Sequence, residues 1–272
     1  MKEIKRVEVP EAALRARKMQ VLARLVAQYR YFDGVVLHAL PWDLPFYGMS
    51  LTLMLKNFRL PVVLYCQDDQ RREAVRWAEQ GATGVYALGS DGFDLACRTT
   101  CTGAGRIISP HYPPVGRTDG WTHQLFHDLL PPTEPDPFMV CDAMNENVAQ
   151  IFPGTDLRSR PDLLESSGVL VVLDDFDEQG RWLLEEQNTA LLRLHRERLP
   201  VVVTGLPEQV EDPSMRRALL RAGVISAGDM TREAALVKFM WTLARTNSIN
   251  GVKMYFSLSF GGEVTQASRS MG

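Results

Sequence analysis

The stretch AGVISAGDMTREAALVKFMW, residues 222–241, decides the fold of this chain. Thr231 carries the side-chain oxygen that suits a helix N-cap, and Glu233 puts a negative charge in the first turn, where the helix dipole favours it. The pattern predicts an amphipathic helix from Thr231 to about Arg245. A shorter helix over residues 215–222 comes just before it.

Strands and helices alternate along the rest of the chain. Short β-branched runs, such as PVVLY at residues 61–65, are typical of buried parallel strands. We expect helices over residues 10–30, 46–58, 69–80 and 181–198, and strands over residues 34–37, 61–65, 84–88, 138–140, 169–173 and 200–204. This alternation with short connections indicates an α/β fold with parallel sheets flanked by helices.

A proline-rich segment separates the two halves of this pattern. Residues 113–137 lack a clear period and hold a cluster of prolines: Pro113, Pro114, Pro131, Pro132, Pro135 and Pro137. We expect a linker over residues 121–137 with a short helix near residues 122–130. The N-terminal domain then covers residues 1–120, and the C-terminal domain covers residues 138–272.

Composition excludes several classes of function. The chain has 272 residues, of which 45% are hydrophobic and 23% are charged, with a net charge of -3. This charge gives no electrostatic attraction to nucleic acid or to an anionic membrane. No run approaches the roughly 20 apolar residues of a membrane span, and the charged start lacks the apolar core of a signal peptide. We therefore expect a cytoplasmic protein.

The four cysteines do not suggest a disulfide framework or a metal centre. Cys97 and Cys101, together with His111, sketch a set of zinc ligands, but no second ligand pair follows at zinc spacing. The common nucleotide-binding motifs, G-x-G-x-x-G and Walker A, are absent as well. We therefore expect no cofactor and no metal.

Several motifs, in a shared order and spacing, resemble the L-asparaginase family, in particular its cytosolic type I members. Residues 222–241 are similar to the family's A-G-V-I-x-x-x-D-M-T-x-E-A-A-L-x-K-L-M-W, and GEVT at residues 262–265 is similar to its closing G-E-x-T. YFDGVVLH at residues 31–38 resembles Y-D-G-x-V-x-x-H. RTTC at residues 98–101, followed by SPHYPP at 109–114, resembles R-x-T-K and S-P-N-x-P-P. The resemblance extends to the related amidotransferase subunit that supplies ammonia for glutaminyl-tRNA synthesis.

The resemblance implies the two-domain asparaginase fold, but the catalytic residues depart from the family. The family's threonine nucleophile and the first strands of its N-terminal sheet have no counterpart, and we expect this loss to expose a sheet edge or a groove. His38 is followed by ALPWDLP in place of G-T-D-T, and the catalytic lysine is replaced by Cys101. The loop after residue 66 is shortened, and a glycine-rich loop is replaced by FDEQG at residues 176–180. Losing a single member of a catalytic set can cost about 10⁴ in rate.

Four residues remain as candidates for a vestigial pocket: His38, Asp43, Thr100 and Cys101. Cys101 is either a new nucleophile paired with His38 or His111, or a neutral thiol that fills the space of the lysine. The resemblance offers Asp43 as a candidate for a displaced relic of the family's aspartate, and Thr100 keeps the family's residue type. No catalytic residue is assigned. Lys238 is expected to be structural, and the acidic residues 174–178 are expected to form a solvated turn.

The resemblance and its gaps lead to three hypotheses. The first is a catalytically inactive asparaginase-like protein, a pseudoenzyme that acts as a structural or regulatory subunit by self-association or within a larger complex. The second is an amidohydrolase whose active site is rebuilt or is completed by a partner chain. The third is a sensor of a small amino-acid ligand.

Overall fold

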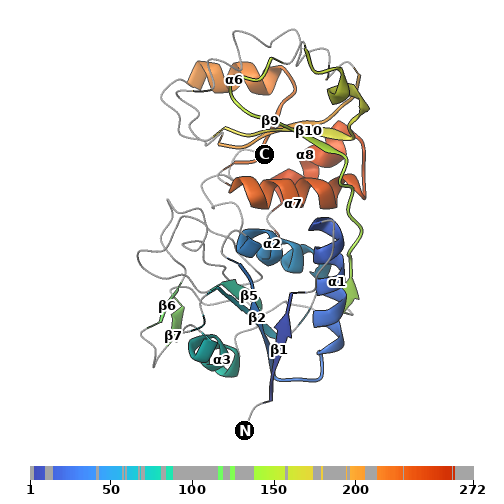
Figure 1. The fold of residues 1–272 in the computed structure, drawn as a ribbon. Coiled ribbons are helices and arrows are strands. Elements are labelled where there is room, and N and C mark those ends of the chain that lie inside the picture. Colours follow the sequence, from blue (N-terminus) through green and yellow to red (C-terminus); the bar gives the residue numbers. More distant parts are fainter. Residues whose placement is uncertain are drawn as a thin grey trace. The chain divides into compact units, whose positions relative to one another are not determined.

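The chain folds into two compact units, each built on a parallel sheet (Figure 1). The first unit runs to Ala143 and the second begins at Met144. The computed structural model describes residues 3–9, 15–40, 43–56, 58, 60–66, 68, 71–80, 84–87, 116–118, 123–125, 138–156, 159–173, 179, 194, 197–205, 213–228, 230–258 and 260.

The first unit holds a four-stranded sheet in the order β1-β2-β4-β5. Its strands are β1 (Ile4–Glu8), β2 (Gly34–His38), β4 (Pro61–Tyr65) and β5 (Gly84–Ala87), and all the pairs are parallel. The apolar runs that predict β2, β4 and β5 are confirmed. β2 and β4 are buried on both faces of the sheet, which explains why they are apolar without alternation.

β1 is a strand that the sequence analysis does not assign. Its residues IKRVE mix charged and apolar side chains, as is common for an edge strand that meets solvent. The first strand expected from the sequence is the one at residues 34–37, so β1 is an addition to the expected sheet, and it forms one end of the described strand order. β1 pairs with β2 along its whole length, from Ile4 with Gly34 to Glu8 with His38.

Helices cover both faces of this sheet. Figure 1 shows α3 (Arg71–Gln80) on one side, and α1 (Arg15–Gln28) and α2 (Leu44–Met54) on the other. On the α3 side, Ala74 and Ala78 of the helix pack in one cluster with Val36, Val63 and Tyr65 of the strands. The three predicted helices are thus confirmed within the described residues, whereas residues 10–14 and 69–70 of the predicted ranges lie outside them.

The predicted helix over residues 46–58 is wrong at its end. α2 stops at Met54, and the next two residues form β3 (Leu55–Lys56), which pairs antiparallel with β8 (Met139–Val140). The chain after β8 is tied down further. The backbone N–H of Cys141 donates to the carbonyl oxygen of Met54 at 2.7 Å, and Asp142 pairs with Arg24 of α1. Pairing with a distant segment overrides the local helical pattern here.

The proline-rich segment contains strands where a short helix is predicted. β6 (Gly116–Thr118) and β7 (His123–Leu125) pair antiparallel. The helix near residues 122–130 is therefore wrong over residues 123–125, and its other residues lie outside the described part of the chain. The run His123-Gln124-Leu125 is too short to distinguish the helical period of about 3.6 residues from the strand period of two.

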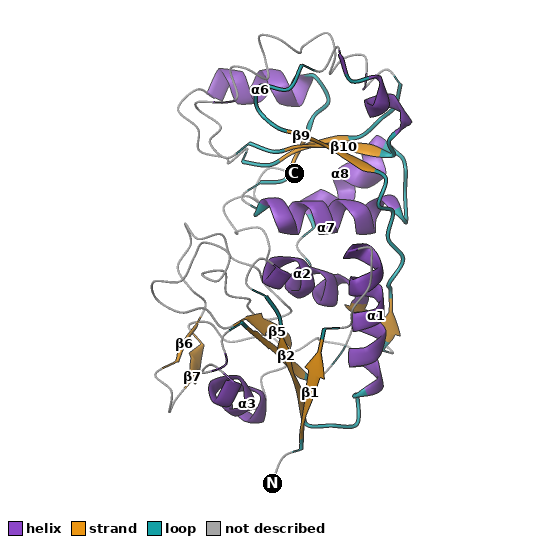
Figure 2. Cartoon of the chain, viewed as in Figure 1, coloured by secondary structure: helices purple, strands orange, loops and turns teal. Residues whose placement is uncertain are grey.

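The second unit holds the sheet β12-β11-β10-β9, again fully parallel (Figure 2). Its strands are β9 (Val148–Ile151), β10 (Gly168–Val171), β11 (Val201–Val203) and β12 (Ile225–Ser226). The 3-10 helix η4 (Pro161–Glu165) and helix α6 (Pro213–Arg221) contribute Leu163 and Leu219 to the core on one face of this sheet. β9 and β12 are not assigned from the sequence. The predicted helix at residues 181–198 lies mostly outside the described residues, and residues 197–198 form a turn.

α7 (Arg232–Leu243) and α8 (Ile249–Ser257) complete the second unit. Thr231 is the N-cap of α7, as predicted, and its hydroxyl oxygen accepts the N–H of Ala234 at 3.2 Å. The amphipathic character expected of this helix is wrong, because every residue from Ala234 to Leu243 is buried. Burial of all these positions replaces the single apolar stripe that is typical of a surface helix.

Replacing Gly168 with alanine should destabilise the second unit, because the added methyl group would overlap the ring of Phe239 and lie 3.1 Å from Leu243. Overpacking of this kind costs about 1–3 kcal/mol. Urea denaturation should show the loss, and the double variant Gly168→Ala/Phe239→Leu should be less destabilised than the sum of the single variants. Strict additivity would contradict the contact.

Replacing Thr231 with alanine should lower the free energy of unfolding by about 1 kcal/mol, because the first turn of α7 loses its cap. Thr231→Ser keeps the hydroxyl oxygen and is the matched control. Equal losses for the two variants in urea denaturation would show that the methyl group, and not the cap, matters at this position.

Candidate functional site

The carboxyl ends of β1, β2 and β4 meet at one edge of the first sheet. Their last residues, Glu8, His38 and Tyr65, are in register, since Glu8 pairs with His38 and His38 with Tyr65. Residues in register on parallel strands point to the same face, and Tyr65 packs on the α3 side. Open α/β sheets bind ligands at the carboxyl ends of their strands, so this row is the first candidate site.

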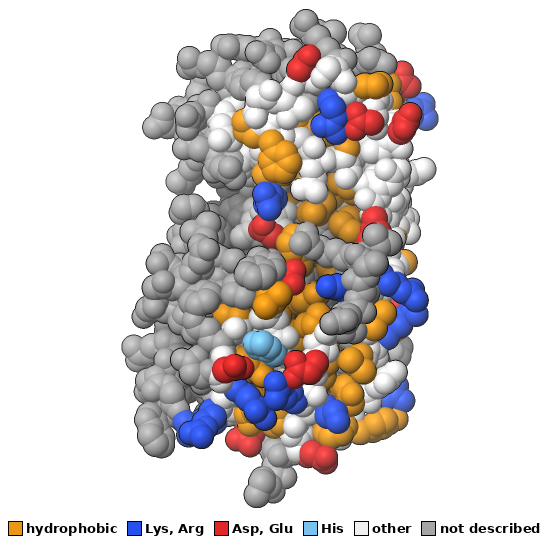
Figure 3. Space-filling model, viewed as in Figure 1, with side chains coloured by type: hydrophobic (Ala, Val, Ile, Leu, Met, Phe, Trp, Pro, Cys, Tyr) orange, Lys and Arg blue, Asp and Glu red, His pale blue; other side chains and the backbone are white. Residues whose placement is uncertain are grey.

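Charged side chains surround this row. Arg6 lies two residues before Glu8 on the same face of β1, and the two form an ion pair at 2.7 Å. The rings of His38 and Tyr65 lie side by side, with their centroids 5.1 Å apart. On the face that it draws, Figure 3 shows a histidine with acidic and basic side chains beside it. The row therefore brings together a carboxylate, an imidazole and a phenol.

Tyr65 is the unusual member of the row. The residue is 0% exposed, and its hydroxyl has no hydrogen-bond partner among the described residues. Burial raises the pKa of the phenol above its ordinary value of 10.0. Arg6 and Arg71 act in the opposite direction, and Glu8 and Asp68 add smaller increases. The side chain therefore stays a neutral phenol, which has a hydrogen to donate and is not activated as a nucleophile.

The structure describes two of the four residues expected in a vestigial pocket. His38 closes β2 and is partly exposed, and Asp43 lies just before α2. The Asp43 side chain does not cap this helix, while its backbone N–H donates to the Leu40 carbonyl oxygen at 2.9 Å. Thr100 and Cys101 lie outside the described residues, as do His111 and residues 174–178.

Sequence reasoning missed Glu8 and Tyr65. Glu8 was missed because β1 was not assigned, and the register that joins it to His38 depends on that strand. Tyr65 ends a run that looks purely apolar, so its hydroxyl gave no signal of its own. A general signal was available, because the last residue of each predicted parallel strand faces the ligand-binding edge.

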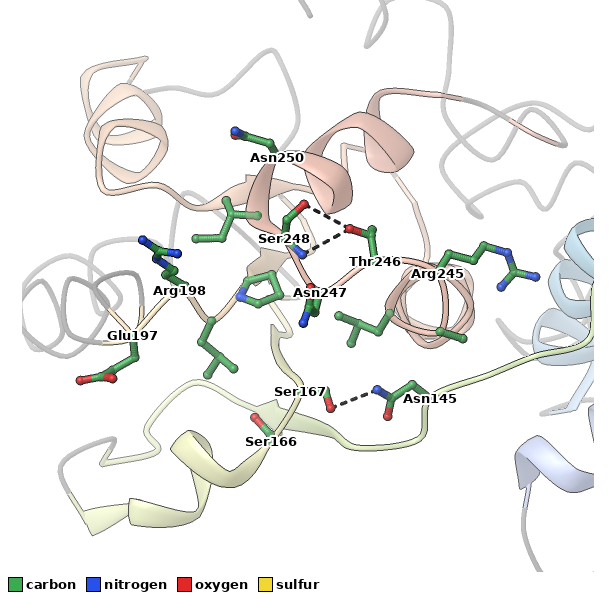
Figure 4. Close-up of a pocket in the computed structure, with 15 residues that line it drawn as sticks. Asn145, Ser166, Ser167, Glu197, Arg198, Arg245, Thr246, Asn247, Ser248 and Asn250 are labelled. Atoms are coloured by element: carbon green, nitrogen blue, oxygen red, sulfur yellow. Dashed lines mark hydrogen bonds between the residues drawn. The ribbon is translucent and has the colours of Figure 1, made fainter.

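A second candidate is a hollow of about 1040 Å³ within the second unit (Figure 4). It lies at the amino ends of β10 and β11. Figure 4 shows Asn145 facing Ser167, which are joined at 3.0 Å, and Thr246 beside Ser248. The described lining holds no histidine, cysteine or lysine, so it offers hydrogen bonds without an evident base for nucleophilic catalysis. Its residues are Asn145, Ser166, Ser167, Glu197, Arg198, Leu199, Pro200, Leu243, Ala244, Arg245, Thr246, Asn247, Ser248, Ile249 and Asn250.

Lys238 is a buried lysine whose side chain makes a structural contact. The residue is 0% exposed, and its Nζ donates to the Leu258 carbonyl oxygen at 2.6 Å, just beyond the end of α8. Its Nζ also lies 5.4 Å from the centroid of the Phe256 ring. These contacts join α7 to the end of α8, which supports the structural role expected from the sequence.

The described part of the chain offers neither a metal site nor a membrane-spanning helix. There, no three His, Cys, Asp or Glu side chains come close enough together to hold a metal ion. None of the helices in the described ranges has the length and apolar character needed to cross a membrane.

Comparison with known proteins shows similarity to L-asparaginases over most of the chain. Models of protein families give no match. An L-asparaginase of Thermococcus kodakarensis is 29% identical over 266 residues, covering 86% of this chain and 76% of that protein. One component of the glutamyl-tRNA(Gln) amidotransferase of Methanobrevibacter smithii is 39% identical over 84 residues, which is 29% of this chain and 19% of that component.

The fold gives the same result as the sequence. The structure of the thermostable L-asparaginase from Thermococcus kodakarensis superposes with a TM-score of 0.75 at 22% identity, covering 93% of this chain and 82% of that one. L-asparaginase I from Vibrio cholerae superposes with a TM-score of 0.71 at 22% identity, with the same coverage of each chain. The chain is therefore a homologue of the L-asparaginases and has their α/β fold.

Proposed function

We propose that this asparaginase homologue does not hydrolyse asparagine and acts as a structural or regulatory subunit of a protein assembly. One observation carries the first half of the proposal. In the row at the carboxyl ends of β1, β2 and β4, the hydroxyl group is that of Tyr65, and it is buried, neutral and without a hydrogen-bond partner among the described residues.

Amide hydrolysis by a hydroxyl needs a base within hydrogen-bond reach of that hydroxyl. Among the described residues Tyr65 has no such base, and its raised pKa disfavours the phenolate. Beyond His38 the chain continues through Ala39 and Leu40, which have no hydroxyl group. The N–H of Ala39 is engaged with the Tyr65 carbonyl oxygen at 3.0 Å, so it is not available to stabilise an oxyanion.

The second half of the proposal rests on an apolar surface at β8. Met139 and Val140 are 51% and 37% exposed, although they are consecutive residues of a strand. β8 pairs with β3 on one edge, and no described strand pairs with its other edge. An uncharged, apolar edge is a template for pairing with another chain. Antiparallel pairing of β8 with β8 of a second copy would satisfy both edges symmetrically.

The relatives agree with a role in assembly. One group of similar proteins is named as a subunit of an amidotransferase, and the similarity to this chain is local, covering 29% of it in the example above. A homologue that keeps the fold, loses an activated nucleophile and exposes an apolar strand suits such a subunit. We therefore propose that the chain functions by binding other protein chains through its surface.

Incubation of the purified protein with asparagine or glutamine should release no ammonia above the uncatalysed rate. Loss of one member of a catalytic set costs about 10⁴ or more in rate, and removals are not additive. A coupled ammonia assay measures the release, with the Thermococcus kodakarensis L-asparaginase as the positive control. Sustained turnover that is lost in Cys101→Ala or His38→Ala would overturn the proposal in favour of a rebuilt active site. Turnover only with an added partner chain would favour a partner-completed one.

Size-exclusion chromatography with light scattering should give a mass above the 30.6 kDa of one chain. Met139→Glu should lower that mass, because a charge on the β8 edge opposes pairing. Met254→Glu is the matched control, since Met254 is 53% exposed on α8 of the other unit. A wild-type protein that is strictly monomeric, or equal effects of the two variants, would contradict self-association through β8.

A further inference from the structure

The hydroxyl of Tyr65 is a buried polar group without a hydrogen-bond partner among the described residues. Buried polar groups are nearly always hydrogen-bonded, and an exception points to a missing water, ion or ligand. Tyr65 is fully buried, and no described residue accepts its hydroxyl hydrogen. The side chain itself is held firmly, because its ring packs in the cluster with Val36, Val63 and Ala74.

Tyr65 packs against α3, in one cluster with Ala74 and Ala78 of that helix. Ala74, which packs in the same cluster as Tyr65, belongs to the first turn of this ten-residue helix. The first N–H groups of a helix have no acceptor within the helix, and the positive end of the helix dipole is located there. Arg71, the first residue of α3, acts electrostatically on the Tyr65 phenol. The guanidinium charge of Arg71 therefore acts on the Tyr65 phenol beside a helix end whose first backbone amides have no acceptor within the helix.

The charges at this point favour an anion. Arg71 and Arg72 stand at the end of α3 where the dipole disfavours cations, and no described residue forms an ion pair or a hydrogen bond with Arg71. Two acids, Glu8 and Asp68, lie in the neighbourhood. Glu8 is neutralised by its ion pair with Arg6, and each arginine acts on the Tyr65 phenol more strongly than either acid does.

We propose that the amino end of α3 binds a small oxyanion, the phosphate or carboxylate group of a ligand. The Tyr65 hydroxyl donates a hydrogen bond to one of its oxygens, Arg71 pairs with its charge, and the first N–H groups of α3 complete the site. The His38 ring, whose centroid is 5.1 Å from that of Tyr65, forms a neighbouring wall. This site is separate from the β8 edge and from the hollow of the second unit.

Titration calorimetry at constant ionic strength tests the proposal, with sodium chloride as the background salt. The probes are inorganic phosphate, sulfate and malonate, so that the tetrahedral and carboxylate anions are compared directly. We expect saturable binding of at least one probe, and the preferred probe identifies the source of the oxyanion. Tyr65→Phe and Arg71→Gln should each weaken that binding about tenfold or more, because each removes a charge-assisted hydrogen bond. Arg72→Gln, a change at the next exposed arginine, is the matched control and should have little effect.

Thermal unfolding provides an independent readout. In chloride buffer alone, Tyr65→Phe should be at least as stable as the wild type, because it removes a hydroxyl that has no partner among the described residues. The preferred anion should then raise the Tm of the wild type more than that of Tyr65→Phe. Absence of saturable binding for all three probes would overturn the proposal and leave an ordered water as the partner of Tyr65. Binding that Tyr65→Phe and Arg71→Gln leave unchanged would also overturn it.

Discussion

The parallel register of β1, β2 and β4 is the constraint on which the rest of the first unit depends. Pairing Glu8 with His38, and His38 with Tyr65, places three different functional groups at one level of the sheet. A shift by one residue would turn each of these side chains to the opposite face. Burial of Val36 and Val63 against α3 fixes the register, because these residues must stay on the same face as Tyr65. The register of these strands thus determines both the packing of the core and the residues that make up the candidate site.

Local sequence patterns were sufficient for the elements that local forces determine. Thr231 has the right group for an N-cap, and PVVLY at residues 61–65 is apolar enough to form a strand in the middle of a sheet. The errors arose where distant residues decide the outcome. Leu55 and Lys56 leave the helical pattern because they pair with β8, and IKRVE becomes a strand because β2 offers it an edge. No window of neighbouring residues contains that information.

The candidate site was harder to predict than the fold. His38 was found through its place at the end of a strand, but Glu8 and Tyr65 become neighbours only through the order of the strands in the sheet. Tyr65 is notable because its hydroxyl has no hydrogen-bond partner among the described residues. The absence of a partner cannot be recognised in a sequence. Thr100 and Cys101, chosen from the resemblance to the asparaginases, stay predictions. The homology establishes the fold, whereas the chemistry depends on side chains that differ from the family's motifs.

The pairing of β3 with β8 also bears on how the chain reaches its native state. Residues of α1 contact Asp142 across sequence separations of 118 and 122 residues, and the Cys141 amide closes onto Met54. Closing so long a loop carries an entropic cost that only the finished contacts offset, and contacts of this kind slow folding. During synthesis, β3 at the end of α2 therefore stays unpaired until residues 139–142 have left the ribosome. Nascent chains of this protein are most exposed to misassembly during that interval.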